Sequence, residues 1–264
     1  MSLIEAQDLD FTGRPHGPHA APRLTVALAR SMVEVIDAQR LRYKVFADEM
    51  GAAVGSRATG LDIDRFDAHC DHLVVRDESS GRVVGTYRIL PPHRAADIGT
   101  LYSEQEFDLA RLAHLKPALI EIGRSCVHRD YRTGAAIMLL WAGLANYMKG
   151  HGYRHLIGCA SVALLDGGAL AAQVRDALAS HLIEPEYRAV PRCAFPHERV
   201  QRTGGCVLPP LIKGYLRVGA RVCGEPAWDP DFNTADFLIW LSLDQLKSRY
   251  ARHFDLLAQQ ARVP

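Results

Sequence analysis

One segment constrains the fold of this chain more than any other: a predicted strand that leads through a basic turn into a long apolar helix. The strand and turn occupy residues 121–132, and the helix is predicted over residues 134–149. A helix N-terminus presents free backbone N–H groups, so this junction suits an anionic, phosphate-bearing ligand. Glu121 and Arg124 are three residues apart and would lie on opposite faces of an ideal strand. A bulge near Gly123 would let both side chains reach one site.

The rest of the chain predicts one mixed α/β domain. Strands are predicted at residues 24–28, 72–77, 82–90, 154–161 and 235–243, and helices at 31–49, 168–181, 209–219 and 244–260. Ser31 and Glu34 form a capping box that marks the start of the first helix. This order of elements indicates a mixed central sheet flanked by helices on both faces. We expect a flexible leader rich in Gly and Pro at residues 1–22, and a single domain at 23–264.

The composition argues against several classes of protein. The formal net charge of +1 gives no indication of nucleic-acid binding. The six cysteines are widely spaced without a C-x-x-C pair, which favours a reduced cytoplasmic protein over a secreted disulfide framework. The acidic start, with Glu5, Asp8 and Asp10, does not resemble a secretory signal. The longest apolar run, residues 135–145, is too short to span a bilayer.

Charge is distributed unevenly in the last third of the chain. A basic stretch contains Arg188, Arg192, Arg199, Arg202, Lys213, Arg217 and Arg221, and an acidic stretch follows with Glu225, Asp229, Asp231, Asp236 and Asp244. We expect the basic stretch to receive an acidic partner or an anionic lipid surface. The alternative is a solvated face that pairs with the acidic stretch in the folded chain.

A series of short motifs in a fixed order resembles a known family. The segment 42–46, Arg-Tyr-Lys-Val-Phe, is similar to the R-x-x-V-F signature of the acyl-homoserine-lactone synthases and their relatives in the GNAT superfamily. The chain more closely resembles the N-acyltransferases of ornithine lipid synthesis. That closer resemblance rests on motifs at residues 70–75, 84–88, 121–127, 140–141, 158–161, 209–211, 213–217 and 231–233. The resemblance covers roughly residues 24–255.

The resemblance implies a GNAT-like fold and an acyltransferase of ornithine lipid biosynthesis. Its reaction would move a 3-hydroxyacyl chain from acyl carrier protein to the α-amine of L-ornithine, with lyso-ornithine lipid as the product. No permanently bound cofactor is implied, because the donor is carried on the 4'-phosphopantetheine of acyl carrier protein. The expected partners are acyl carrier protein and L-ornithine, without nucleic acid. The expected location is the cytoplasm, and the basic stretch is compatible with peripheral contact at the cytoplasmic face of the inner membrane.

Acyl transfer to an amine requires a neutral nitrogen, a fixed geometry and stabilisation of the developing oxyanion. With the support of the resemblance, we expect Glu121 to be the catalytic base, directly or through a water, and Arg124 to share the catalytic site. Backbone N–H groups of residues 123–126 would meet the oxyanion. The alternative for Glu121 is a buried carboxylate that pairs with Arg124 or Arg88.

Further residues are expected to bind the substrates. Arg42 would hold the acceptor or order the neighbouring loop, and Phe46 would line the acyl path; the alternative is a core Phe beside an outward-facing Arg. Asp62 and Asp64 would share a strand face and bind a cationic amine, unless they belong to a polar turn. Arg88 would pair with Glu121, bind the acceptor carboxylate or form a structural ion pair.

The turn before the long helix departs from the acetyl-CoA pattern of the superfamily. Tyr131 stands where that pattern has Arg or Gln, which makes the phosphopantetheine of a carrier protein a better donor than CoA. The residues expected to bind the phosphopantetheine are Arg129, Arg132 and Gly134, and those expected to dock the carrier protein are Arg199, Arg202 and Lys213.

Two other hypotheses keep the fold but change the function. One is an acyl-carrier-dependent synthase of other N-acyl amino acids or of acyl-homoserine lactones, and the other is a non-catalytic module that binds carrier protein. Cys126 is interpreted as a small core residue rather than an acyl-enzyme nucleophile. Residues 69–72, His-Cys-Asp-His, are not expected to bind a metal, because four adjacent residues rarely converge on one ion.

Overall fold

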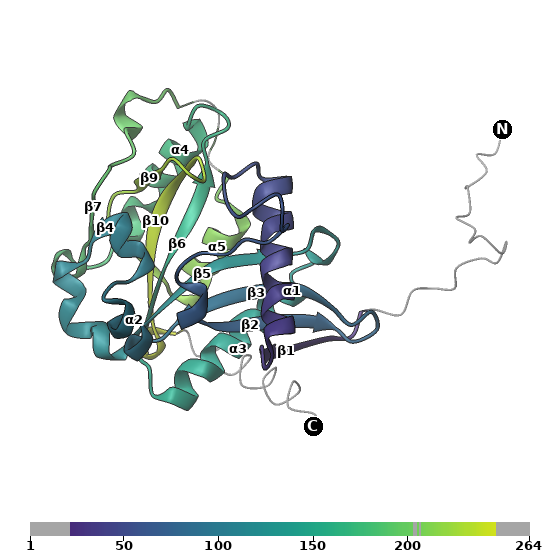
Figure 1. The fold of residues 1–264 in the computed structure, drawn as a ribbon. Helices are drawn as coiled ribbons and strands as arrows, with labels where there is room; N and C mark the ends of the chain where they lie inside the picture. The colour runs from purple at the N-terminus through teal and green to yellow at the C-terminus, as the bar shows by residue number, and fades with distance from the viewer. Residues whose placement is uncertain (1–21, 203–204, 206, 247–264) are drawn as a thin grey trace, which may run out of the picture.

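The computed structural model describes residues 22–202, 205 and 207–246 (Figure 1). The predicted leader therefore lies outside the described residues, apart from Pro22. Most of the predicted closing helix also lies outside them, and its described beginning, Leu243–Gln245, is a single 3₁₀ turn. The division of the chain into a leader and one domain stays a prediction.

A mixed sheet forms the centre of the fold. In spatial order its strands are β1 (Leu24–Leu28), β2 (Asp71–Asp77), β3 (Arg82–Leu90), β5 (Leu119–Val127), β6 (His155–Ala163), β10 (Thr234–Ser242) and β8 (Arg221–Val222), and β9 (Ala227–Asp229) also pairs with β10. Neighbours are antiparallel except β5 and β6. The two-residue strands β4 (Phe107–Asp108) and β7 (Val190–Pro191) pair separately. The longer strands agree with the predicted ones, whereas strands of two or three residues are too short to leave a periodic pattern.

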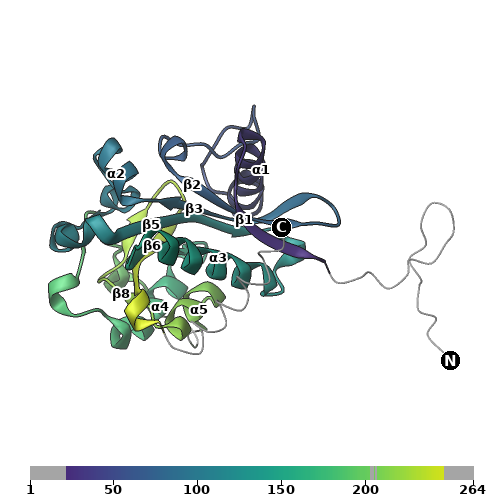
Figure 2. The same cartoon turned by 90° about the horizontal axis from the view of Figure 1, so that it is seen from below.

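Helices cover both faces of this sheet, as predicted (Figure 2). One face carries α1 (Met32–Tyr43) and α2 (Pro92–Ile98), and the other carries α3 (Ala135–His151), α4 (Ala169–Leu178) and α5 (Pro210–Val218). The apolar stripe of α3 packs Leu140, Leu144 and Met148 against the β5 side chains Ile120 and Ile122. This packing covers the α3 side of β5, and charged residues occupy the opposite side.

The first helix begins where the sequence predicts. Ser31 is the N-cap and accepts a hydrogen bond from the Glu34 N–H at 3.3 Å, and the Glu34 carboxylate turns back and accepts mainly from the Arg30 N–H, at 2.6 Å. After Tyr43 the helix widens into a π-helical segment, Lys44–Glu49. Such segments often occur at functional sites.

The predicted bulge in β5 is present. Gly123 and Cys126 pair with Arg88 and Thr86 of β3, so two residues of β5 between them oppose one residue of β3. Arg124, in this bulge, has a φ of 51°, in the left-handed region that non-glycine residues rarely adopt. The backbone therefore departs from strict alternation between Glu121 and Arg124, as their spacing requires.

Beyond the bulge, β5 and β6 separate. The two strands pair only over Leu119–Glu121 and His155–Ile157. The edge of β5 that faces β6 has no strand partner after Glu121 in the described sheet. The sheet is thus open beside the bulge, on the side where the long strands β6 and β10 continue.

Candidate active site

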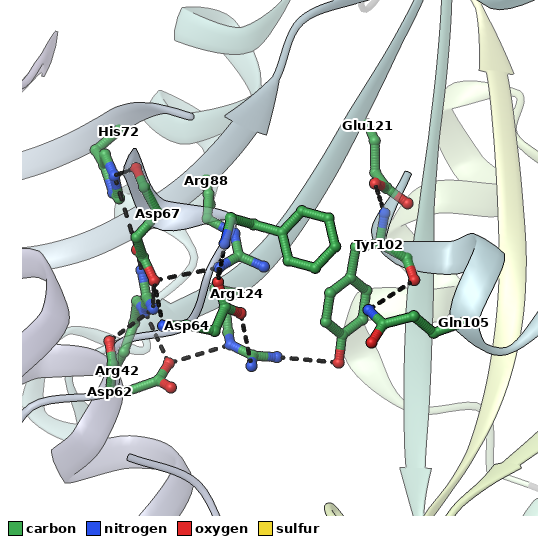
Figure 3. A network of polar contacts seen from close by, with 11 residues as sticks. Arg42, Asp62, Asp64, Asp67, His72, Arg88, Tyr102, Gln105, Glu121 and Arg124 are labelled. Carbon is green, nitrogen blue, oxygen red and sulfur yellow. Dashed lines mark hydrogen bonds and ion pairs between the residues drawn. The ribbon is translucent and has the colours of Figure 1, made fainter. Parts of the chain in front are cut away.

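Arg42 anchors the loop after α1 from inside the protein (Figure 3). Its side chain is fully buried and contacts the Asp62 carboxylate at 2.8 Å through Nε and the Asp67 carboxylate at 2.5 Å through Nη1. Nη2 donates to the Asp62 carbonyl oxygen at 2.7 Å. Burial opposes the ionisation of Asp67, but the hydrogen bond and charge of Arg42 outweigh it and lower the pKa of that carboxyl. Of the two roles expected for Arg42, this geometry supports the ordering of the loop.

Asp64 is shared by two arginines from adjacent strands. Arg88 of β3 contacts its carboxylate at 2.6 Å, and Arg124 of β5 contacts it at 3.2 Å. The expected pairing of Arg88 with Glu121 is wrong: the carboxylate partners of Arg88 are Asp64 and Asp67. Asp64 therefore has two cationic partners already, and this geometry does not favour the expected binding of an amine by Asp62 and Asp64.

Arg124 projects between two aromatic rings. Its guanidinium carbon lies 4.7 Å from the ring centroid of Phe232 and 5.3 Å from that of Tyr102. Its Nε lies 3.1 Å from the Asp62 carboxylate but is not aligned for a hydrogen bond, and Nη1 is 3.4 Å from the Tyr102 hydroxyl. Figure 3 shows this side chain reaching from the charged cluster toward Tyr102. The Nη1 donor of Arg124 therefore has only this long contact with the Tyr102 hydroxyl.

Glu121 lies on the other side of Tyr102 and takes no part in an ion pair within the described chain. Its carboxylate oxygens accept hydrogen bonds from the backbone N–H groups of Tyr102 and Ser103, at 2.5 and 2.7 Å. Burial raises the pKa of Glu121, and these hydrogen bonds only partly oppose the effect. The alternative of a structural pair with Arg88 or Arg124 is therefore wrong. The carboxyl instead holds the segment that carries Tyr102.

These groups surround one pocket above β5. Its lining consists of Phe66, Cys70, Arg88, Leu90, Tyr102, Glu121, Ile122, Gly123 and Arg124. Gly123 is part of this lining, and a Cβ atom added there would meet no atom within 4 Å. The bulge thus brings both predicted catalytic residues, Glu121 and Arg124, to the same pocket. The pocket offers a carboxylate with a raised pKa and two guanidinium groups within one small volume.

A second cavity lies below β5 and is almost entirely apolar. It is lined by Ile122, Trp141, Leu144, Ala145, Met148, Leu156, Tyr215, Val218, Ile239, Leu241, Leu243 and Leu246. Ile122 belongs to both linings, so the cavity and the pocket lie on either side of the same residue of β5. Phe46, expected on the acyl path, is instead buried on the α1 side, where it packs edge-on against Phe232 at 5.9 Å.

The structure also assembles acidic residues that the sequence analysis did not single out. The ligand atoms of Glu106, Cys159 and Asp236 lie within 4.8 Å of one another, and Asp229 contributes a further buried carboxylate. We call Glu106, Asp229 and Asp236 the acidic group. Burial and then the neighbouring carboxylates raise the pKa of Glu106, and burial raises the pKa of Asp236. Among the described residues, no arginine, lysine or histidine forms an ion pair with them.

The acidic group adjoins the pocket through Tyr102. Burial raises the pKa of the Tyr102 phenol, and the charges of Glu106 and Asp229 add to this effect while Arg124 opposes it. Glu106 and Cys159 are only partly buried, so the group is accessible from outside. Glu106 is far from Asp229 and Asp236 in the sequence, and the acidic stretch 225–244 pointed only toward these two aspartates.

The residues expected to receive the donor lie at the end of β5. Gly134 is the N-cap of α3 with a φ of 95°. Arg129 is exposed, and Arg132 donates to the Val127 carbonyl oxygen and pairs with Glu49 at 2.7 Å. Tyr131 turns away and donates to Asp77 at 2.7 Å. The turn thus leaves two arginines beside the open N-terminus of the long helix.

The basic stretch does not pair with the acidic stretch in the way the alternative proposed. Arg202 pairs with Asp176 of α4 at 2.9 Å, whereas Asp229 and Asp236 of the acidic stretch are buried in the acidic group. His197 and Glu225 form an ion pair between the two stretches, at 3.4 Å, and their backbones also pair where Ala194 lies beside Ala227. Arg199 and Lys213 are exposed.

The remaining sequence interpretations concern a nucleophile, a metal and the membrane. Cys126 is buried, and burial raises the pKa of its thiol to about 12, which disfavours a thiolate. In the part of the chain that the structure describes, three potential metal ligands come together at Glu106, Cys159 and Asp236, and not at residues 69–72. None of the described helices has the length and apolar character needed to cross a membrane.

Comparison with known proteins adds to this geometry. Residues 41–142 match the model of the GNAT acetyltransferase domain. The chain is 38% identical over 250 residues to the L-ornithine N(alpha)-acyltransferase of Rhizobium meliloti (strain 1021), covering 88% of this chain and 84% of that protein. It is 37% identical over 243 residues to the enzyme of the same name from Rhodobacter capsulatus, covering 87% and 93%.

A solved structure resembles the fold. The acyl-homoserine lactone synthase BjaI superposes with a TM-score of 0.54 at 16% identity, covering 92% of this chain and 91% of that one. At this identity the likeness concerns the fold alone. Together with the matching domain model, it confirms the expected GNAT-like fold class.

Proposed function

The chain belongs to the family of L-ornithine N(alpha)-acyltransferases, and on this premise we propose that it transfers a 3-hydroxyacyl group from acyl carrier protein to the α-amine of L-ornithine. The product would be lyso-ornithine lipid, from the first step of ornithine lipid biosynthesis. The observation that supports this most is the pocket above β5, which Glu121 and two arginines line beside an acidic group that has no ion-pair partner among the described residues. An acceptor with one carboxylate and two amines complements such a distribution of charge.

Glu121 is the proposed base. A free α-ammonium group has a pKa of about 7.7–8.0, so a carboxylate with a raised pKa can take up its proton, directly or through a water. The neutral nitrogen attacks the thioester carbon, a C–N bond forms, and the C–S bond breaks to release the phosphopantetheine thiol. Glu121 releases the ammonium proton to water, and the second proton, which the nitrogen loses on attack, passes by way of Glu121 to the departing sulfur. The raised pKa of Glu121 supports this role.

The two arginines are the proposed partners of the acceptor's carboxylate. Arg88 and Arg124 line the pocket, and Nη1 of Arg124 has only a 3.4 Å contact with the Tyr102 hydroxyl. A guanidinium binds a carboxylate through paired hydrogen bonds, which fixes orientation as well as position. With the carboxylate held there, the α-amine would face Glu121 across Tyr102.

The acidic group is the proposed partner of the acceptor's side-chain ammonium. The carboxylates initially considered, Asp62 and Asp64, each contact arginines. Glu106 and Asp236 carry raised pKa values because burial and like charges disfavour their ionised forms. A bound ammonium group would stabilise those ionised forms, so binding and proton release are coupled. The cationic side chain of ornithine supplies this charge.

The donor is the proposed occupant of the open edge of β5. The arm of phosphopantetheine would start at Arg129, Arg132 and Gly134, where a helix N-terminus and two arginines favour a phosphate. The arm would follow the edge of β5 that lacks a strand partner, so that backbone N–H groups of residues 123–126 can meet the oxyanion. The acyl chain would enter the apolar cavity below β5. No resident cofactor is needed for these steps.

The identity of the products tests this proposal. Purified protein would be incubated with 3-hydroxytetradecanoyl-carrier protein or the matching acyl-CoA and a panel of amino acids, and the products analysed by mass spectrometry. We expect N-acylornithine from the carrier-bound donor. Acylation of another amine, or lactone formation, would show that ornithine is not the acceptor. Transfer from acyl-CoA alone would show that acyl carrier protein is not the donor.

The same assay with Glu121→Gln tests the site. Loss of a general base lowers turnover by roughly 10²–10⁴-fold, and we expect that loss while the variant still binds carrier protein. The matched control is Glu198→Gln, an exposed position outside the pocket, which should retain wild-type turnover. Carrier-protein binding without turnover in the wild-type protein would favour the binding-module hypothesis instead.

A further inference from the structure

A small polar cluster lies within the apolar layer below β5. The hydroxyl groups of Tyr87, from β3, and Tyr215, from α5, hydrogen-bond to each other, although the two residues are only 1% and 8% exposed. Ser125 of β5 also contributes a hydrogen bond that lowers the pKa of Tyr87 against the effect of burial. A chain that needed only an apolar core here would use phenylalanine at both positions, since each buried hydroxyl requires a partner.

One donor of this cluster has no well-aligned acceptor. The indole nitrogen of Trp141, from α3, is buried and has no partner that meets the full geometry of a hydrogen bond, although a weaker hydrogen-bonding contact with the Tyr87 hydroxyl lowers the pKa of Tyr87. In a pair of hydroxyls, only one proton lies between the two oxygens, so the other hydroxyl keeps a proton of its own to donate. Buried donors without partners are rare in folded proteins and call for an explanation.

The position of Trp141 is fixed by packing. Its ring stacks on Tyr215 with centroids 5.6 Å apart and an interplanar angle of 26°. Gly214 permits this approach, because a Cβ atom at that residue would lie 2.4 Å from Cη2 of the indole. The unsatisfied nitrogen is therefore held in a defined place beside the two hydroxyls. A preorganised donor of this kind suits recognition of a polar group.

The cluster borders the cavity proposed for the acyl chain. Trp141 and Tyr215 both line that cavity, and Ile122 separates it from the pocket of Glu121 and Arg124. Ser125 follows Arg124 directly in the bulge of β5. An acyl group whose carbonyl carbon lies at the bulge would therefore meet the cluster within its first few carbons, and the purely aliphatic lining only farther along.

We propose that Tyr87, Tyr215 and Trp141 bind the 3-hydroxyl of the acyl chain and make the enzyme select 3-hydroxyacyl donors over unsubstituted ones. The inference rests on the proposed function and adds the residues that determine donor specificity. The carbon that bears the hydroxyl lies two bonds from the carbonyl carbon, and the hydroxyl can accept from the indole N–H and donate to a phenol oxygen. An unsubstituted chain would occupy the same cavity and leave these donors unpaired, which discriminates by roughly tenfold to a hundredfold.

Competition between two donors tests the inference. The wild-type protein, with ornithine as acceptor, would receive equal amounts of 3-hydroxytetradecanoyl- and tetradecanoyl-carrier protein, and the product ratio gives the ratio of kcat/KM values. We expect a preference of at least about tenfold for the hydroxylated donor. Tyr215→Phe and Trp141→Phe should each reduce this ratio at least severalfold, mainly by lowering kcat/KM for the hydroxylated donor.

A matched control is Tyr147→Phe. Tyr147 is another buried tyrosine, on α3, whose hydroxyl donates to Asp71 at 2.6 Å outside the cavity lining. This variant should keep the wild-type ratio. A ratio that stays unchanged in the Tyr215 and Trp141 variants would overturn the inference.

A second measurement does not depend on the folding of any variant. The wild-type protein would be offered the two enantiomers of the 3-hydroxyacyl donor, because fixed donors on one side of the chain should accept one enantiomer at least tenfold better. Equal use of both enantiomers and of the unsubstituted chain, with N-acylornithine still formed, would overturn the inference while leaving the proposed function intact. Failure of every donor to give N-acylornithine would overturn the proposed function, and the inference with it.

Discussion

At the scale of single residues, charge balance separates the structural groups from the reactive ones. The loop network contains Arg42, Arg88 and Arg124 together with Asp62, Asp64 and Asp67, so its cations and anions match. This match also offsets the left-handed conformation of Arg124, which costs about 1–2 kcal/mol for a residue with a side chain. Glu121 and the acidic group are left outside that network. The raised pKa values of Glu121, Glu106 and Asp236 follow first from burial, without a cation in an ion pair to offset it.

The acidic group should make stability depend on pH. A carboxyl whose pKa is raised in the folded state binds its proton more tightly there than in the unfolded chain. Its contribution is thus complete below the unfolded pKa of about 4.5 and is lost as the pH rises through the folded pKa of Glu106. Across that window, each such carboxyl lowers the free energy of unfolding by about 1.4 kcal/mol for every unit by which the pH rises. We expect Glu106→Gln to flatten this decline in urea unfolding between pH 5 and pH 9.

The same variant should weaken acceptor binding. Without the Glu106 charge, the KM for ornithine should rise roughly tenfold, which corresponds to about 1.4 kcal/mol, while the KM for the acyl donor stays the same. Glu198→Gln, at an exposed position, serves as the control for both measurements. An unchanged KM for ornithine would remove the acidic group from the acceptor site, and an unchanged pH profile would show that Glu106 does not titrate abnormally.

At the scale of elements, the end of the first helix and the bulge of β5 together build the pocket. The π-helical segment Lys44–Glu49 follows Arg42, whose buried guanidinium ties the Asp62–Asp67 loop to α1. The bulge turns Arg124 toward the same loop. Asp62 contacts both Arg42 of α1 and Arg124 of the bulge, so it links the two elements.

Loss of Arg42 should therefore destabilise the protein strongly. Arg42→Met leaves two buried carboxylates without their main cation, a change that costs about 3–5 kcal/mol. Arg40→Met is the matched control on the same helix: Arg40 pairs with Asp37 on the surface, with a side chain 61% exposed, and such a pair is worth roughly 0–1 kcal/mol. Urea unfolding at pH 7 compares the two variants.

The pH dependence distinguishes the ion pairs from simple loss of packing. Arg42 lowers the pKa of Asp67, so this contribution is present above the unfolded pKa of about 3.8 and is lost as the pH falls toward the folded pKa. The deficit of Arg42→Met relative to wild type should shrink below pH 4, because Asp67 is then protonated in the unfolded chain and in the variant. A deficit that stays constant with pH would assign it to lost packing.

At the scale of the whole molecule, the separation of β5 and β6 connects the two faces of the sheet. The charged pocket lies on the α1 face and the apolar cavity on the α3 face, and β5 borders both. A donor that enters at the N-terminus of α3 can place its thioester at the bulge and its chain below the sheet. The acceptor can approach from the opposite face. Under the proposed function, the two substrates would lie on different sides of one strand.

The proposed docking of the carrier protein belongs to this scale, since it would involve a surface remote from the pocket. Charge reversal at Arg199, Arg202 and Lys213 should raise the KM for acyl carrier protein about tenfold or more and weaken its dependence on salt. Arg202→Glu also breaks the contact with Asp176, so Arg199→Glu with Lys213→Glu is the cleaner combination. The double variant Arg23→Glu with Arg57→Glu, at two exposed positions, is the control, because it changes the net charge by the same amount. An unchanged salt profile would remove this surface from the docking model.

Local physics explains what could be predicted from the sequence. Periodicity and capping are properties of neighbouring residues, so the long strands and α1, α3, α4 and α5 agree with their predicted positions within a few residues. The spacing of Glu121 and Arg124 predicted the bulge for the same reason, because alternation along a strand is a local rule. Motifs in a fixed order indicated the family before any contact was known.

The sequence by itself determined the elements of this protein, its fold class and the two residues that meet in the pocket. Only the tertiary structure decided which charges are neutralised. It paired Asp62 and Asp64 with arginines, left Glu121 without one, and brought Glu106 beside Asp236 and Asp229. The physical reason is that the pKa and reactivity of a carboxylate depend on its burial and on charges within a few ångströms. Those neighbours come from distant parts of the chain, and no spacing along the sequence identifies them.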